Sequence, residues 1–269
     1  GSVAASHRKR HSIERALPYV REDRVLLEGQ LHRQLLWLKD SWTWMFETRV
    51  LPDLPRNDMR PSALDVGCGP GHVMKLLDQF FDLTGVDIDA EMVGSAKGRG
   101  SNVIQAVAIE LPFEDGSFDV VYCSFLMLWL NDPARAIAEM KRVARHWVVC
   151  LAEPDYGGRI DHPSELTILT NCLSLDIKGL GGDPNVGRKL RSFFSSNGME
   201  AEIGVYQGVW DLKMLHNQSK EEWASIERAA QRYLDASVLS KGKAVWEEAI
   251  KAGDLFQYNP IFYALGRKT

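Results

Sequence analysis

Residues 64–71 of the chain read LDVGCGPG, a short apolar run that ends in an acidic residue and three alternating glycines. Residues 72–77 then have the composition of a helix, so the sequence predicts a strand, a glycine loop and a helix. Glycines permit a tight turn, and a backbone without side chains can come against a ligand. The segment therefore indicates a binding site for a nucleotide-like ligand at the end of a strand.

The spacing of the glycines narrows the class of nucleotide. The dinucleotide fingerprint has the order G-x-G-x-x-G, in which the third glycine lets helix and strand pack closely. Counted from Gly67, that third position is His72, whose side chain is too large for the role. A G-x-x-x-x-G-K-[ST] phosphate-binding loop is absent as well. The sequence supports neither a dinucleotide site nor a P-loop.

A second aspartate stands at the distance that a nucleotide site requires. Residues 81–89 read FDLTGVDID and predict a second strand that ends in Asp87. Asp87 stands twenty positions after Gly67. In parallel nucleotide-binding folds a carboxylate near this distance accepts short, charge-assisted hydrogen bonds from ribose hydroxyls. Ile88, directly after it, offers an apolar face to a purine ring. The alternative is that Asp87 only caps the helix predicted to begin near Ala90.

Two further blocks complete a pattern that resembles class I S-adenosylmethionine-dependent methyltransferases of the small-molecule type. Residues 110–122 read ELPFEDGSFDVVY, similar to the family's LPF-x-DGSFD stretch before the fourth strand. Residues 123–133, CSFLMLWLNDP, resemble the loop that passes the cofactor. With DVGCGPG and GVDID, four blocks stand in the family's order between about Ser62 and Glu153. The resemblance implies a Rossmann-like fold, S-adenosyl-L-methionine as cofactor, and methyl transfer.

The resemblance also implies roles for individual residues. The glycine loop would cradle the amino-acid part of the cofactor, with Asp65 facing its ammonium group. Relatives often carry an acidic residue where Val107 stands, so the adenine amino group must be bound differently here. The implied cofactor-binding residues are Asp65, Gly67, Cys68, Gly69 and Gly71 in the loop, Asp87 and Ile88 for ribose and adenine, Ala108 and Ile109 at the adenine edge, and Ser124 beside the methionine end.

Composition sets further limits on function. Hydrophobic residues make up 45% and charged residues 25% of the 269 residues, as in ordinary soluble globular proteins. The formal net charge of −4 gives no general attraction to nucleic acid or an anionic membrane, and no apolar run is long enough to cross a bilayer. The basic cluster at residues 7–11 fits a solvated terminus, a nuclear address or an RNA-binding arm. We expect a small-molecule partner, no strong nucleic-acid partner and no membrane partner, while the oligomeric state stays open.

The four cysteines lack metal-ligand spacing, so no metal site is predicted. Cys68, Cys123 and Cys150 fall in the apolar nucleotide-binding part, which favours reduced thiols. With no visible secretory signal, these features predict a cytoplasmic location.

The N-terminal part predicts a helix that is rich in aromatic residues. From Leu27 onward, apolar residues recur at helical spacing: Leu31, Leu35, Leu38, Trp42 and Met45. Trp37 and Trp42 on this helix, and Tyr19 before it, are predicted to bind the acceptor as part of an apolar roof. The alternative for these residues is ordinary packing against the sheet.

Strands and helices alternate through the rest of the chain. After residues 62–66 and 81–87, strands are predicted near 102–106, 118–123, 146–152 and 201–209, with helices near 71–80, 90–98, 133–145 and 183–198. A last strand near 255–265 is interrupted at Pro260. The prediction is an α/β, Rossmann-like, seven-stranded and mostly parallel sheet with helices on both faces.

One methyltransferase domain, residues 1–269, is expected. Its predicted parts are an N-terminal helical cover (1–55), a cofactor-binding core (62–211), a helical insertion (212–253) and a final strand (254–269). In the insertion, Ser219–Glu222 reads as a capping box, and a second helix is predicted at 244–252.

Methyl transfer depends mainly on alignment and on exclusion of water, so an acid–base pair is optional. The catalytic residues stay unknown. Glu153, Asp155 and Tyr156, at the predicted end of the fifth strand, are the candidates for acceptor binding or proton removal. The alternative for Asp155 is a structural role in the turn before Gly157 and Gly158. The alternative functions are an RNA or protein methyltransferase, or a non-catalytic cofactor-binding subunit.

Overall fold

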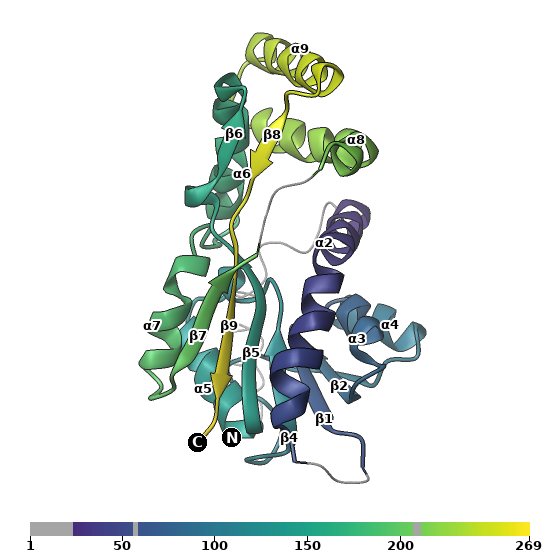
Figure 1. Ribbon diagram of the computed structural model, residues 1–269, viewed down its shortest axis with the longest axis vertical. Coiled ribbons are helices and arrows are strands. Elements are labelled where there is room, and N and C mark those ends of the chain that lie inside the picture. The colour runs from purple at the N-terminus through teal and green to yellow at the C-terminus, as the bar shows by residue number, and fades with distance from the viewer. Residues whose placement is uncertain (1–23, 56–58, 207–210) are drawn as a thin grey trace, which may run out of the picture. The chain divides into compact units, whose positions relative to one another are not determined.

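The computed structural model describes residues 24–55, 59–206 and 211–269. Strands and helices alternate along this part of the chain (Figure 1). Most of the strands join one seven-stranded sheet in the order β3-β2-β1-β4-β5-β9-β7. The predicted Rossmann-like, mostly parallel sheet is therefore confirmed.

The order of the strands creates a switch point in the middle of the sheet. In sheet order they are β3 (Val103–Gln105), β2 (Asp82–Asp87), β1 (Ser62–Val66), β4 (Phe118–Cys123), β5 (Ala144–Pro154), β9 (Ile261–Arg267) and β7 (Ala201–Val205). The neighbours from β3 to β5 pair in parallel, and Figure 1 shows β9 running opposite to β5. Because the chain order reverses between β1 and β4, ligands of such a sheet bind where these two strands end.

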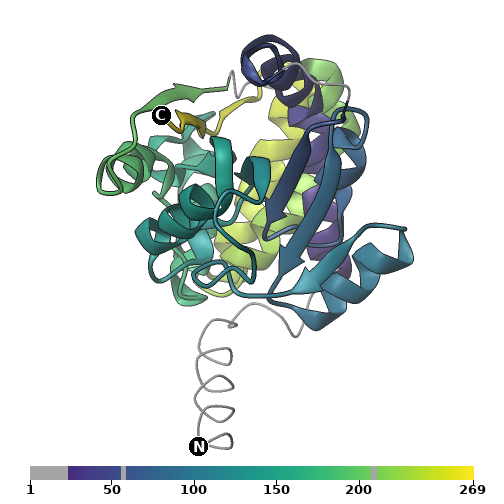
Figure 2. The same cartoon turned by 90° about the horizontal axis from the view of Figure 1, so that it is seen from below.

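Helices cover both faces of this sheet (Figures 1 and 2). They are α2 (Arg24–Met45), α3 (His72–Leu77), α4 (Ala90–Gly98), α5 (Pro133–Val143) and α7 (Leu190–Ser195). α2 packs beside α3, and α5 packs beside α7. Just after α2, the Phe46 ring lies edge-on to Phe81 and Tyr122, with ring centroids 5.3 and 6.1 Å apart. These aromatic contacts hold the end of α2 against the core.

The described chain divides into two compact units. The core unit contains the described residues up to Glu153, together with Lys189–Gly204 and Tyr263–Thr269. The second unit contains Pro154–Arg188 and the described residues of Val205–Phe262.

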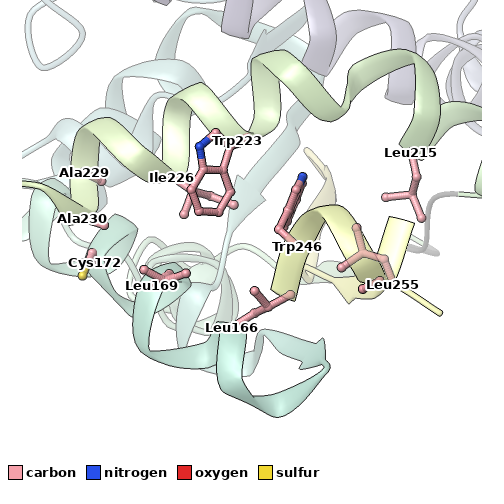
Figure 3. Close-up of a cluster of buried hydrophobic side chains, with 11 residues drawn as sticks. Leu166, Leu169, Cys172, Leu215, Trp223, Ile226, Ala229, Ala230, Trp246 and Leu255 are labelled. Carbon is pink, nitrogen blue, oxygen red and sulfur yellow. The ribbon is translucent and has the colours of Figure 1, made fainter. Parts of the chain in front are cut away.

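The second unit has a hydrophobic core of its own (Figure 3). Its elements are α6 (Thr167–Gly179), α8 (Leu212–Ala230), α9 (Ala236–Ala252), and an antiparallel pair of β6 (Ile160–His162) and β8 (Phe256–Tyr258). Trp223 of α8 and Trp246 of α9 lie with ring centroids 5.7 Å apart inside this core. The helices predicted at 212–253 are therefore part of a larger unit that also includes α6, which the sequence analysis did not predict.

The capping-box prediction for α8 is wrong. The helix begins at Leu212, and its cap is Asp211, whose carboxylate accepts a hydrogen bond of 2.8 Å from the Met214 amide. Ser219 lies inside the helix, where its hydroxyl donates to the His216 carbonyl at 3.1 Å. The S-x-x-E pattern was thus a chance match within a longer amphipathic helix.

Two other predicted boundaries meet different outcomes. The helix predicted from Asp183 begins only near Gly187, as a 3-10 turn before α7, although the Asp183 carboxylate accepts a hydrogen bond from the Asn185 amide as a helix cap would. The predicted interruption at Pro260 is confirmed, since β8 ends before it and β9 begins after it.

Candidate active site

The glycine loop folds back onto the end of β2. Gly67, Gly69 and Gly71 have φ angles of 74°, 51° and 82°, which favour glycine because other residues are strained there. The amides of Gly67 and Cys68 both donate to the Val86 carbonyl, at 2.8 and 3.0 Å. This part of the loop is therefore fixed by backbone contacts within the protein, and α3 starts directly after Gly71.

Asp87 ties the glycine loop to the turn that follows β2. One carboxylate oxygen accepts a hydrogen bond from the Gly69 amide at 2.8 Å, and the other accepts one from the Asp89 amide at 2.9 Å. Burial raises the pKa of Asp87, and these amides oppose that rise. Asp89, not Asp87, caps α4, since its carboxylate accepts from the Glu91 amide. The capping alternative for Asp87 is therefore wrong.

Asp65 is a buried carboxylate with no counter-charge among the residues that the structure describes. Its side chain is 1% exposed at the carboxyl end of β1, beside Tyr122 of β4 in the strand register. Among the described residues, no group makes a well-aligned hydrogen bond to either carboxylate oxygen or to the Tyr122 hydroxyl. Burial raises the pKa of Asp65 to about 8, the Tyr122 hydroxyl lowers it, and the charge of Asp87 raises it further. A buried acid of this kind calls for a cationic or hydrogen-bonding partner.

The residues predicted around adenine follow β2 and β3. Ile88 is half-buried, and its carbonyl accepts a hydrogen bond of 2.9 Å from the Gln105 side chain. Ala108 is half-buried and Ile109 is exposed, in a turn closed by the bridge between Val107 and Glu110. The turn thus follows the carboxyl end of β3, on the side of the sheet end where Asp87 lies.

Ser124 opens a tightly held turn after β4. Ser124 is half-buried, and Phe125 after it has a φ of 50°, which is rare for an aromatic residue and costs conformational energy. The Phe125 amide donates to the Ala152 carbonyl at 2.7 Å. The turn is therefore strained at Phe125, next to the switch point of the sheet.

Glu153 anchors the same turn from the end of β5. It is fully buried, and its carboxylate accepts hydrogen bonds from the amides of Leu126 and Met127 at 2.9 and 2.8 Å, with the Leu128 amide at 3.4 Å. Burial raises the pKa of Glu153 to about 8, against the effect of these amides. The observed contacts use Glu153 to hold backbone, so its predicted part in proton removal has no support in this geometry.

Asp155 and Tyr156 belong to the second unit. The Asp155 carboxylate is 2% exposed and forms a bidentate pair with Arg188, at 2.6 and 2.7 Å. Its backbone carbonyl accepts a hydrogen bond from the Gly158 amide at 3.0 Å. This contact belongs to the turn in which the alternative gave Asp155 a structural role. Tyr156 is half-buried, and its amide donates to the Pro184 carbonyl. Asp155 is thus already neutralised, whereas the role of Tyr156 stays a prediction.

The residues of the predicted aromatic roof have different environments in the structure. Trp42 is 1% exposed and lies in the hydrophobic core, which is the packing alternative rather than a binding surface. Trp37 is half-buried and stays a candidate. Tyr19 lies outside the described residues.

The structure brings most of the predicted cofactor-binding residues to one edge of the sheet. Asp65, the glycine loop, Asp87 and Ser124 all lie at the carboxyl ends of β1, β2 and β4. Sequence reasoning missed Tyr122 and Leu126 there, because a tyrosine in a strand and a leucine in a loop carry no distinctive signal.

No group of three or more His, Cys, Asp or Glu in the described ranges could hold a metal ion. All four cysteines are free and buried. Within the described ranges, no helix is both long and apolar enough for a membrane span.

Comparisons with known proteins agree with this geometry. Residues 64–150 match the model of a family described as a methyltransferase domain. An uncharacterized 37.1 kDa protein of transposon TN4556 from Streptomyces fradiae is 38% identical over 228 residues, which is 79% of this chain and 64% of that protein. A demethylmenaquinone methyltransferase of Staphylococcus aureus is 36% identical over 119 residues, 40% of this chain and 48% of that enzyme. The chain thus spans between about half and two-thirds of the length of these relatives.

A solved structure shares the fold. Geranyl diphosphate C-methyltransferase from Streptomyces coelicolor, crystallised with Mg²⁺, geranyl diphosphate and S-adenosyl-L-homocysteine, superposes with a TM-score of 0.52 and 14% identity. The match covers 86% of this chain and 79% of that one. At this identity the likeness concerns the fold alone.

Proposed function

We propose that this chain is a class I S-adenosylmethionine-dependent methyltransferase that methylates a small-molecule acceptor, because residues 64–150 match the model of a methyltransferase domain and lie on the Rossmann-like sheet. The observation that carries the proposal is Asp65, a buried carboxylate without a cation among the described residues. S-Adenosylmethionine carries an α-ammonium group and a sulfonium, and a cationic ligand suits this acidic sheet end.

The residues present fit this cofactor. Asp65 would hold the ammonium group, and burial makes that ion pair strong because little water screens it. Asp87 would hold the ribose, since each of its oxygens accepts one backbone amide and keeps a lone pair for a hydroxyl. Ile88 and Ala108, both half-buried, would flank the adenine.

When bound, the cofactor supplies an activated methyl group that an oxygen, nitrogen or carbon of the acceptor attacks in line. The protein contributes alignment, which is worth on the order of 7–11 kcal/mol in well-oriented reactions. The backbone contacts of Gly67, Cys68 and Gly69 hold the loop in one shape before a ligand arrives. A general base is optional in this mechanism: where the accepting atom carries a proton, a base that removes it would add roughly 10²–10⁴-fold, and Glu153 and Asp155 are already engaged in other contacts.

A small acceptor is supported by a relative and by charge. The Staphylococcus aureus relative acts, by its name, on demethylmenaquinone. The formal net charge of −4 provides no general attraction for RNA. We assign acceptor selection to the second unit, whose independent hydrophobic core allows its surface to vary without disturbing the sheet. We also keep the proposal of one methyltransferase domain, with residues 1–55 as its helical cover.

Calorimetric titration of S-adenosylmethionine and S-adenosylhomocysteine tests the cofactor assignment. Asp87→Ala should weaken both by roughly 100-fold, because two hydrogen bonds to a charged group are lost. The variant should also unfold at a lower temperature, since Asp87 holds the Gly69 and Asp89 amides, so affinity is measured where it is fully folded. Asp82→Ala is the matched control, because Asp82 is an exposed carboxylate at the other end of β2 and should leave affinity unchanged. Unchanged affinity in Asp87→Ala would contradict the ribose assignment.

Methyl-labelled cofactor tests the acceptor class. The protein is incubated with separate small-molecule, RNA and protein fractions of a cell extract. Label in the small-molecule fraction supports the proposal. Label in RNA or protein would show that the chain is an RNA or protein methyltransferase instead. Cofactor binding without label in any fraction would favour a non-catalytic subunit.

A further inference from the structure

Glu153 has contacts that the proposed methyl transfer does not require. Its carboxylate is buried in the core unit and accepts hydrogen bonds from the consecutive amides of Leu126 and Met127, while the Leu128 amide lies 3.4 Å from its second oxygen. No cationic group of the described chain pairs with it. A carboxylate that gathers successive amides fixes the backbone path of that segment.

The segment that Glu153 holds is strained at its first residue. Phe125 has a φ of 50°, a conformation that a non-glycine residue keeps only when its surroundings enforce it. Two contacts enforce it from β5: the Ala152 carbonyl accepts from the Phe125 amide, and the Glu153 carboxylate accepts from the amide of Leu126. Without the carboxylate, the turn keeps one of these two anchors and can relax.

Leu126 connects this turn to the glycine loop. A Cβ atom built on Gly67 would lie 2.8 Å from Leu126 Cδ1 and 3.3 Å from Cδ2. The leucine side chain therefore lies directly against the backbone of Gly67, where the loop turns away from β1. A shift of the Leu126 backbone changes the packing of the first glycine of the loop.

We propose that Glu153 is a positioning residue for the cofactor site: through the Leu126 amide it holds the Leu126 side chain against Gly67 and so keeps the glycine loop in its binding shape. The inference rests on the proposed function, since it takes the methyl donor as the ligand of that loop. Glu153 itself does not touch the reacting atoms. Its effect is on cofactor affinity.

A double-mutant cycle in the full chain tests this role, with S-adenosylhomocysteine as the titrated ligand. Glu153→Leu removes both acceptor oxygens, so the Leu126 and Met127 amides, which share one oxygen, lose their acceptor and affinity should fall about tenfold. Leu126→Ala should weaken binding by a similar factor. Because both act through one contact, the double variant should also be weakened only about tenfold, whereas independent effects would multiply to roughly 100-fold.

The control separates positioning from general stability. Asp119 is a carboxylate that accepts from the backbone amide of Ser62 at the opposite end of β4. Asp119→Asn should lower the unfolding temperature and leave affinity unchanged. Hydrogen exchange at the Leu126 and Met127 amides is a second measurement. Ligand binding should slow this exchange in the unmutated chain, and the exchange should be faster in Glu153→Leu than in the unmutated chain.

The outcomes are distinct. If the unmutated protein fails to bind S-adenosylhomocysteine, the proposed function fails, and this inference with it. If it binds and Glu153→Leu binds equally well, or if the effects of the two substitutions multiply, Glu153 has only a structural role and the inference is overturned. If Glu153→Leu does not fold, unchanged exchange at Leu126 and Met127 on ligand addition would also overturn it.

Discussion

The two ends of the core sheet use the same device, a carboxylate that accepts backbone amides, but they balance its charge differently. At the amino end, Asp119 accepts from the Ser62 amide at 2.8 Å and pairs with Arg145 at 3.0 Å. At the carboxyl end, Asp65, Asp87 and Glu153 have no cationic partner among the described residues. Asp119 thus has a cationic side chain of the protein beside it, whereas none of these three carboxylates has one among the described residues.

The pKa values follow this difference. Burial acts to raise the pKa of Asp119, but the hydrogen bonds from Ser62 and the charge of Arg145 bring it below its ordinary value. Burial raises the pKa values of Asp65 and Glu153 to about 8, because nothing of opposite charge compensates. Perturbed carboxylates of this kind concentrate at functional sites, where a ligand supplies the missing interaction. The contrast therefore supports the proposal that the cofactor binds at the carboxyl end.

The largest expected effect is on stability against pH. The raised pKa values of Asp65 and Glu153 mean that the folded state binds more protons than the unfolded state between the ordinary carboxylate range and about pH 8. The contribution of these two carboxyl groups to folding stability is fully present when pH lies below the ordinary carboxylate pKa range. It is lost as pH rises through about 8. The free energy of unfolding in urea should therefore fall by several kcal/mol across this window.

A pair of variants separates the two ends in the same measurement. Asp65→Asn with Glu153→Gln should flatten the slope in this window. Asp119→Asn should leave the slope intact, because the lowered pKa of Asp119 gives a contribution that disappears only as pH falls below the ordinary range. A slope that is unchanged in the first variant would show that the carboxyl end is not the source of the pH dependence.

The next effect is on cofactor affinity. Asp65→Asn should weaken S-adenosylmethionine binding by roughly 10- to 100-fold, the range for a hydrogen bond to a charged group. The same substitution should raise the free energy of unfolding near neutral pH, because the raised pKa of about 8 makes folding take up a proton at Asp65 and asparagine removes that cost. Calorimetry and urea unfolding measure the two quantities. Equal affinities for Asp65→Asn and the unmutated chain would remove Asp65 from the site.

Sequence alone predicted the parts of the site that obey local rules. The glycine spacing and the position of Asp87 after β2 reflect how a strand, a tight turn and a helix must connect, so a short stretch of chain contains the whole signal. The sheet was predictable for the same reason, since buried parallel strands are continuous apolar runs.

The parts that sequence could not predict depend on contacts between distant residues. Glu153 accepts a hydrogen bond from the Leu126 amide, 27 positions earlier in the chain. No sequence pattern in either segment indicates that the two residues are in contact. Trp42 lies on a helical apolar stripe that fits core packing and a binding roof equally well. The capping motif at Ser219 failed because packing of α8 in the second unit extends the helix back to Leu212.

The smallest expected effect concerns Val107, where the resemblance to class I methyltransferases implies an acidic residue. Val107 is half-buried in the turn after β3, beside the predicted adenine residue Ala108. Val107→Asp would add an acceptor for the adenine amino group, and one net hydrogen bond should tighten binding roughly two- to tenfold. Val107→Leu is the matched control, since it changes size without adding an acceptor. An analogue of the cofactor with hypoxanthine in place of adenine should lose this gain, because it has no amino group to donate. If Val107→Asp tightened both ligands equally, the gain would come from general charge at the acidic sheet end and not from an adenine contact, and the assignment of this turn to the adenine edge would be wrong.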